Sequence, residues 1–173
     1  MKNLLSIVSF ALLCSCAPNY ITQPEVPVEK PAVAKNNTKR ITKDNWSIDL
    51  PVDLVSVSNT NDPIDTTYMA PDKQMVVAFA VDDDPNDTLS KYASGFAKGM
   101  VEAGGVILDS RAGKISGLDA ALIIVGVDSQ DISFNFITLD TKKAYVLSCS
   151  LVMSQLKERG KLCFDIAHSV VIR

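Results

Sequence analysis

Four strand-like segments follow one another in the second half of the 173-residue chain, and only short turns separate them. Strands joined by short turns pair in an antiparallel manner, because a parallel pair requires a crossover of a dozen or more residues. We therefore expect an antiparallel meander. Ala121 to Val127 is apolar on both faces, which predicts that this strand lies centrally and is covered on both sides. The four segments are 105–115, 118–128, 130–140 and 143–152.

Further elements are expected before the meander. Alternating apolar residues from Trp46 to Leu50 predict a strand, and the run Lys73–Asp82 predicts a buried strand. Residues 66–70 are placed as the hairpin partner of that buried strand, because Pro71-Asp72 supplies a turn. The hydrophobic period then changes, and apolar residues at helical spacing predict a helix from Asp87 to Ala103.

The predicted helix has start and stop signals and two internal glycines. Asp87 or Thr88 is placed to cap its N-terminus, and the Gly104-Gly105 pair stops it. Gly95 and Gly99 lie one turn apart, and each costs up to about 1 kcal/mol relative to alanine inside a helix. Close packing on a sheet is the leading explanation for these glycines, and a surface for a partner is the alternative.

The C-terminal segment "KLCFDIAHSVVIR" predicts a second helix that packs on the sheet, with Cys163, Ile166, Ala167 and Val170 on one face. Strand, strand, helix, meander and helix together describe an α+β domain, in which helices flank an antiparallel β-sheet. A chain of this length has room for one ordinary domain, which we place at 42–173.

The N-terminus predicts a lipoprotein signal peptide at 1–15. Lys2 is followed by an apolar run from Leu4 to Leu13 that has signal length and is too short to span a bilayer. The sequence Leu13-Cys14-Ser15-Cys16 resembles a bacterial lipobox, in which a small residue precedes the acylated cysteine. We therefore expect Cys16 to carry the lipid, palmitate among its acyl chains, and Cys14 to be discarded. An uncleaved or conventionally cleaved signal with two incidental cysteines is the alternative.

Residues 16–41 are expected to form the lipidated cysteine and a proline-rich disordered tether. Ala17 follows Cys16, and no aspartate is present there to retain the protein in the inner membrane, so in a Gram-negative host we expect the outer membrane, facing the periplasm. Lys35, Lys39, Arg40 and Lys43 form a small basic cluster. Ordinary solvation of a linker is the leading interpretation of this cluster, and contact with anionic lipid headgroups is the alternative.

Composition and motifs argue against several function classes. The formal charge of -3 with dispersed basic residues does not suit nucleic-acid binding. His168 is the only histidine, and common hydrolase and nucleotide-binding motifs are missing from the sequence, so we expect neither an enzyme nor a cofactor. A tetrahedral zinc site is not expected either, because there are no clustered thiols.

The acidic stretch "VDDDPNDTL" places Asp82, Asp84 and Asn86 at positions one, three and five of an EF-hand calcium loop. The match then fails, because Asp87 replaces the glycine at position six and Ala93 replaces the glutamate at position twelve. The leading interpretation is an acidic turn before the positive N-terminus of the helix, with no metal. A weak cation site outside the EF-hand pattern is the alternative.

Cys149 lies in the last predicted strand, and Cys163 lies in the C-terminal helix. In an exported protein this pair is expected to form a disulfide. Two buried free thiols are the alternative.

From about Asn45 to Ile172 the order of elements resembles the PsbP-like superfamily, through "WSIDLP", "LSKYASGFAKGMVEAGG", "ISGLDAALIIV" and "KKAYVLSCSLV". Because of the lipobox, the envelope lipoproteins of the DcrB-like group are the nearest comparison. The resemblance implies a PsbP-like α/β/α sandwich that docks onto other proteins. It implies no shared catalytic motif and transfers no functional residue.

The leading functional hypothesis is a membrane-anchored envelope lipoprotein whose periplasmic domain is a non-enzymatic protein-binding adaptor or accessory factor. One alternative is a lipoprotein that binds a small ligand or cation in a cleft. Another is a phage- or prophage-encoded lipoprotein that shields a host receptor.

Overall fold

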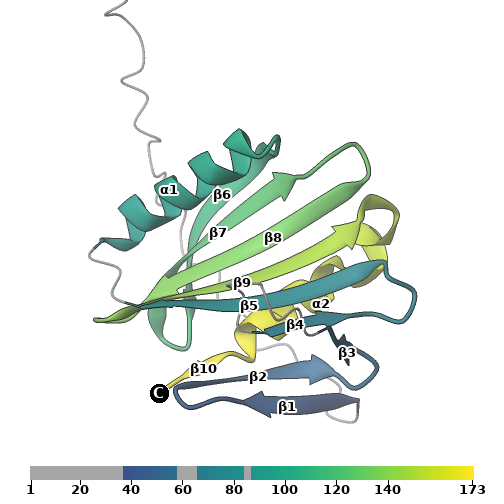
Figure 1. Cartoon of the computed structure of the whole chain (residues 1–173), viewed down its shortest axis with the longest axis horizontal. Helices are drawn as coiled ribbons and strands as arrows, with labels where there is room; N and C mark the ends of the chain where they lie inside the picture. The colour runs from purple at the N-terminus through teal and green to yellow at the C-terminus, as the bar shows by residue number, and fades with distance from the viewer. Residues whose placement is uncertain (1–36, 58–65, 84–86) are drawn as a thin grey trace, which may run out of the picture. The chain divides into compact units, whose positions relative to one another are not determined.

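The computed structural model describes residues 37–57, 66–83 and 87–173 (Figure 1). The predicted signal peptide, Cys16 and most of the predicted tether lie outside these residues. Within the described part of the chain, no helix is long and apolar enough to cross a membrane.

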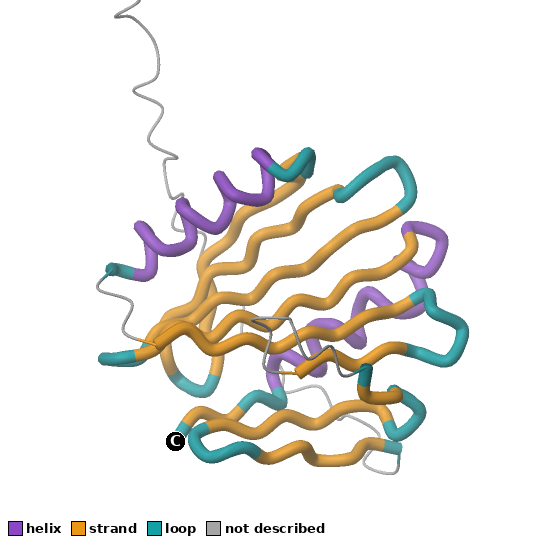
Figure 2. The backbone as a smooth tube through the Cα atoms, in the orientation of Figure 1, coloured by secondary structure: helices purple, strands orange, loops and turns teal. Residues whose placement is uncertain are grey.

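The described residues form two antiparallel sheets and two α-helices (Figure 2). The smaller sheet has three strands in the order β1-β2-β10, and the larger has seven in the order β3-β4-β5-β9-β8-β7-β6. The elements are β1 (Thr38–Thr42), β2 (Trp46–Pro51), β3 (Val55–Ser56), β4 (Thr66–Met69), β5 (Met75–Asp83), α1 (Leu89–Glu102), β6 (Val106–Ile115), β7 (Leu118–Gly126), β8 (Asp131–Leu139), β9 (Lys143–Val152), a 3-10 turn η1 (Met153–Gln155), α2 (Leu156–His168) and β10 (Val171–Ile172).

The predicted meander is present, but the predicted position of its second strand is wrong. β6, β7, β8 and β9 pair in sequence, and β5 adds to β9 on the far side. β7 is therefore next to the edge, and β8 and β9 lie nearer the centre. β7 is nonetheless apolar on both faces because Ile123 and Val125 pack under α1, while Leu122 and Ile124 face the main core.

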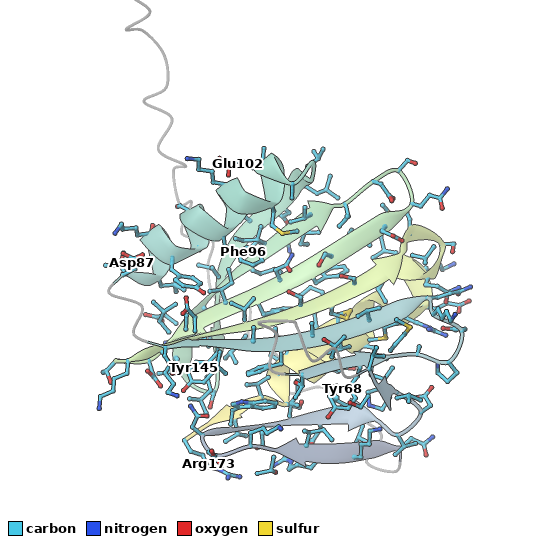
Figure 3. The ribbon with its side chains drawn as sticks, in the orientation of Figure 1. Tyr68, Asp87, Phe96, Glu102, Tyr145 and Arg173 are labelled. Carbon is cyan, nitrogen blue, oxygen red and sulfur yellow. A yellow bond between two sulfur atoms is a disulfide. The ribbon has the colours of Figure 1, made fainter. Side chains whose placement is uncertain are left out.

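Helix α1 forms where the apolar period predicted it, and it lies over β6, β7 and β8 (Figure 1). The Thr88 side chain caps it by accepting a hydrogen bond from the Lys91 backbone N–H at 3.3 Å. Phe96 points from the helix toward the sheet (Figure 3), where it joins Ala93 and Met100 against Val125. α1 thus closes a second, smaller core on one face of the sheet.

The glycines of α1 do not pack on the sheet, so the explanation based on close packing is wrong. Gly95 and Gly99 are exposed, and a Cβ atom built at either position would have no heavy atom within 4 Å. The apolar stripe of the helix is complete without them, since other residues supply its contacts with the sheet. Gly105, just after the helix, is different: its Cβ would lie 2.7 Å from Val125 Cγ1 and 2.9 Å from the Met100 carbonyl oxygen.

The C-terminal helix is also displaced from its predicted range of 161–173. α2 begins at Leu156 and ends at His168, and the last residues form β10. Val171 pairs with Ser47 and Ile172 with Trp46, so the open edge of β2 gives the chain end a strand partner that local periodicity does not reveal. Val170 is buried, as predicted, but it lies beyond the helix.

The N-terminal boundary of the domain lies before residue 42. β1 pairs over its whole length with β2, from Thr38 with Pro51 to Thr42 with Ser47. Arg40 binds both carboxylate oxygens of Asp49 at 2.6 Å. The predicted tether of 16–41 therefore overlaps β1, which belongs to the domain because it pairs with β2.

The main core lies on the sheet face opposite α1, between that face, α2 and the small sheet. Its aromatic residues make two groups: Trp46, Phe79 and Tyr145 near the small sheet, and Phe134 and Phe136 against Phe164 of α2. Cys149 of β9 and Cys163 of α2 form the predicted disulfide in this core, and both are fully buried.

Gly95→Ala and Gly99→Ala should each raise the free energy of unfolding by about 0.5–1 kcal/mol, because alanine removes backbone entropy and meets open space. Gly105→Ala should lower it by about 1–3 kcal/mol, because the new methyl would overlap backbone. Urea unfolding of the three variants beside the parent protein checks both signs. Equal effects at all three positions would contradict the packing described for α1.

Replacing Cys149 and Cys163 together by alanine should lower the free energy of unfolding by at least about 3 kcal/mol, the chain-entropy value for a loop of about 15 residues. The loss adds to the cost of removing two fully buried sulfur atoms. Urea unfolding of the double variant and of the parent with its disulfide intact gives the difference. A loss below about 1 kcal/mol would mean that the bridge contributes little to the stability of the fold.

Candidate functional site

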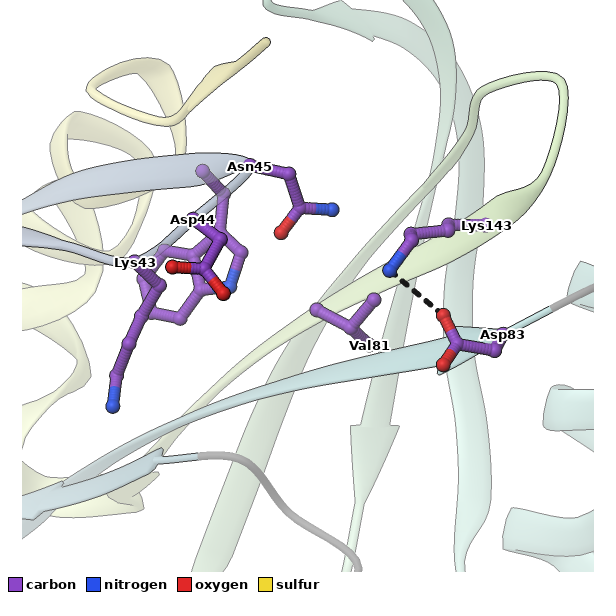
Figure 4. Close-up of a pocket in the computed structure, with 7 residues that line it drawn as sticks. Lys43, Asp44, Asn45, Val81, Asp83 and Lys143 are labelled. Carbon is purple, nitrogen blue, oxygen red and sulfur yellow. Dashed lines mark ion pairs between the residues drawn. The ribbon is translucent and has the colours of Figure 1, made fainter.

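A polar cavity of about 250 Å³ lies between the β1–β2 turn and the ends of β5 and β9 (Figure 4). Residues from three separate parts of the chain line it: Lys43, Asp44, Asn45, Trp46, Val81, Asp83 and Lys143. Lysine and aspartate are both represented twice, so the cavity presents charges of both signs. We refer to it as the polar pocket.

The surrounding elements fix the positions of these side chains. The β1–β2 turn is closed by a hydrogen bond from the Lys43 backbone N–H to the Trp46 carbonyl oxygen at 2.9 Å. On the opposite wall, antiparallel pairing of β5 with β9 sets Asp83 directly across from Lys143. Their side chains form an ion pair with Nζ and Oδ1 2.8 Å apart, marked by the dashed line in Figure 4.

A chain of hydrogen bonds ties the pocket to the β8–β9 turn. Asn45 Nδ2 donates to the Tyr145 hydroxyl oxygen at 3.0 Å, and that hydroxyl donates to Asp140 Oδ2 at 2.8 Å. Asp140 Oδ1 accepts from the backbone N–H groups of Lys142 and Lys143 at 2.7 and 2.8 Å. The β1–β2 turn and the β8–β9 turn, about 100 residues apart in sequence, are thereby held together.

The surroundings of Tyr145 and Asp140 shift the pKa values of both side chains. Burial raises the pKa of Tyr145 to about 12, with a further contribution from the hydrogen bond to the neighbouring Asp140 carboxylate. For Asp140, burial raises the pKa, but the Lys142 and Lys143 N–H groups and the Tyr145 hydroxyl together bring it below the usual value. At neutral pH the tyrosine is therefore a neutral donor and the aspartate an ionised acceptor.

The polar groups that line the pocket can contact a bound partner. Its lining offers amine, carboxylate, amide, indole and one aliphatic side chain. Lys43 and Asp44 are exposed, and neither makes a side-chain hydrogen bond within the described ranges, so both can contact a partner group. A bound polar segment would find both donors and acceptors around the pocket.

Of the three residues considered as a cation site, the structure describes only Asp82, together with its acidic neighbours Asp83 and Asp87. The Asp82 carboxylate accepts a hydrogen bond from the Tyr92 hydroxyl at 3.2 Å, Asp83 pairs with Lys143, and Asp87 pairs with Lys91. Asp84 and Asn86 lie outside the described residues. Across residues 37–57, 66–83 and 87–173, no group of three metal-binding side chains comes together.

Most of the other residues singled out from the sequence lie away from the pocket, and Lys35 of the basic cluster is outside the described residues. His168 is exposed at the end of α2. Lys39 of the basic cluster donates to the Leu54 and Val52 carbonyl oxygens and lies 5.6 Å from the centre of the Tyr68 ring. Since Arg40 is held by Asp49, two members of that cluster are engaged within the domain itself, and Lys43 faces the pocket.

Sequence reasoning missed most of the pocket. Asp44, Asn45, Asp83 and Lys143 carry no motif, and they come together only because β9 pairs with β5 and the small sheet packs beside them. One signal was present: Asp83 is the last residue of β5 and Lys143 is the first residue of β9, so each is a charged residue at the terminus of a strongly apolar strand.

Comparison with known proteins identifies the fold and no more. No known protein-family profile matches the chain, and no curated protein sequence matches it. The solution structure of cyanobacterial PsbP (CyanoP) from Synechocystis sp. PCC 6803 is similar, with a TM-score of 0.67 and 12% identity, covering 82% of this chain and 96% of that one. The domain therefore has a PsbP-like α+β fold, as predicted.

A crystal structure from Bacteroides thetaiotaomicron VPI-5482 is also similar, with a TM-score of 0.52 and 13% identity, over 74% of this chain. The match spans 45% of that longer chain. Its printed description names no activity, so this likeness also concerns the fold alone.

Tyr145→Phe should destabilise the domain by about 1–3 kcal/mol, because Asn45 and Asp140 both lose a partner in a half-buried site. Urea unfolding of the variant beside the parent protein measures the difference.

The parent protein should lose stability between pH 10 and about 12. In this window the unfolded tyrosine ionises while the folded one stays protonated, so the unfolded state binds fewer protons. Unfolding experiments across alkaline pH measure this slope, which should be shallower in Tyr145→Phe. Identical slopes would contradict the raised pKa.

Proposed function

We propose that this protein is a lipid-anchored bacterial envelope protein whose PsbP-like domain is a non-enzymatic adaptor that binds another envelope protein. The anchor is Cys16, the cysteine of the lipobox that follows a small residue, Ser15. Triacylation of one cysteine gives lasting attachment, because each buried methylene contributes about 0.8 kcal/mol. The domain then works at the membrane surface, in the periplasm and at the outer membrane if the host is Gram-negative.

The observation that carries the binding role is the polar pocket, with charges of both signs around one cavity. Asp83 and Lys143 form one wall as a fixed ion pair, whereas Lys43 and Asp44 project from the tip of the β1–β2 turn. An arrangement of this kind selects a partner segment that also carries both signs, because each misplaced charge is penalised. A polar loop of an envelope protein fits that description.

The position of the pocket also supports this role. Its first residues follow β1 directly, and β1 is where the described chain begins. The pocket therefore belongs to the part of the domain that is nearest in sequence to the anchor.

A photoreactive amino acid placed at Lys43 of the full lipidated chain should cross-link one dominant envelope protein in living cells. The matched position is Lys98, an exposed lysine on α1 that pairs with Glu102 at 3.7 Å. Introducing Asp44→Lys beside the probe should reduce the adduct about tenfold or more by reversing one charge of the pocket. Mass spectrometry identifies the adduct.

Three outcomes decide the proposal. An adduct at Lys43 that is lost with Asp44→Lys and missing at Lys98 supports docking through the pocket. Equal adducts at both positions, or an adduct that ignores Asp44→Lys, would contradict it. Loss of the adduct in a Cys16→Ala variant that folds normally would tie binding to the anchor.

A further inference from the structure

The long edge of the larger sheet is open. β6 spans Val106–Ile115 and pairs with β7 on one side only, and no strand of the described residues covers its outer side. The opposite edge of the same sheet, β3, has two residues. An uncovered strand of this length presents a row of backbone donors and acceptors that can accept another strand.

Charges restrict which strand can add there. Asp109, Arg111 and Lys114 stand along β6, and a bulge interrupts its pairing with β7 between Ile107 and Asp109. Asp109 lies across from Ile124 and Arg111 across from Leu122, so both charged side chains are on the same face of the sheet. There Arg111 Nε and Asp109 Oδ2 form an exposed ion pair within the strand, 2.5 Å apart, and a second copy would have to exchange this pair for contacts across the interface. Such features normally block indiscriminate pairing, and they admit only a strand whose charges match.

Two copies of the segment Asp109-Ser110-Arg111 have complementary charges when they pair in the antiparallel direction. With a two-fold axis at Ser110, Asp109 of one copy lies opposite Arg111 of the second, and the reverse contact forms by symmetry. Neighbouring registers fail this test. An axis at Asp109 would place the two Asp109 carboxylates opposite each other, and an axis at Arg111 would do the same with the two guanidinium groups. An axis at Ala112 would place Arg111 opposite Gly113, which carries no charge.

We propose that β6 is the interface between two copies of this chain, which pair antiparallel about Ser110 and join their larger sheets edge to edge. The side-chain sizes agree with the charges. Beyond Asp109, the bulky Leu108 of one copy meets the small Ala112 of the second. Leu108, the extra residue at the bulge, therefore faces a small side chain. This inference does not depend on the pocket or on the identity of a partner protein.

Charge reversal of the full chain, purified in mild detergent, tests the interface. Asp109→Arg and Arg111→Asp should each weaken dimerisation by about tenfold or more, because each puts two like-charged pairs across the axis. The double variant Asp109→Arg/Arg111→Asp should restore the dimer, because the complementary pairs form again with signs exchanged. Sedimentation equilibrium gives the dissociation constants, and thermal melting shows that each variant folds.

Lys98→Glu is the matched control, since it reverses one charge of an exposed ion pair on α1 and should leave dimerisation unchanged. In addition, Ser110→Cys should form a disulfide-linked dimer under mild oxidation, because residues facing each other across antiparallel strands are close enough for one. Ser94→Cys, exposed on α1, should not. A parent protein that stays monomeric at millimolar concentration overturns the proposal, as does a double variant that remains as weak as the single ones.

Discussion

The stacking of Trp46 on Phe79 is the contact on which the rest of the arrangement depends. The ring centres are 4.1 Å apart, and Trp46 is 2% exposed. This pair fixes the small sheet beside β5 of the larger sheet, which brings the β1–β2 turn to the ends of β5 and β9. Tyr145, 6.4 Å from Phe79, extends the aromatic group and carries the hydroxyl that binds Asn45. The polar pocket exists because these two sheets are held together.

Local patterns in the sequence were sufficient for most of the elements and insufficient for their arrangement. Alternation and helical spacing located the meander strands and α1, since these patterns reflect which face each element buries. They placed β7 at the centre because apolar composition does not record strand order. That order is set by the distant pairing of β5 with β9. β1 and β10 were missed for the same reason, as each depends on an open edge of β2 for its strand conformation.

The candidate site could be predicted even less well. The disulfide followed from two cysteines in elements expected to pack together, and its presence needed only the correct assignment of a strand and a helix. The pocket needed the contact between residues 43–46 and 143–145, which no motif signals. Gly95 and Gly99 were predicted to pack on the sheet, but both are exposed. A glycine inside a helix lowers the stability of that helix, but this alone does not show that another element packs against it. Because both glycines face solvent, packing on the sheet is not the reason that they occur in α1.

The state of Cys16 tests the central claim, a domain held at the membrane by lipid, most directly. Cells expressing the full chain would be fed an alkyne-tagged fatty acid, and the mature protein would be analysed by intact mass and by sequencing its N-terminal peptide. We expect a mature chain that begins at Cys16, carries the label and weighs more than the bare polypeptide by the acyl groups, with no label in Cys16→Ala. A mature chain that begins elsewhere, or an unmodified Cys16, would contradict it.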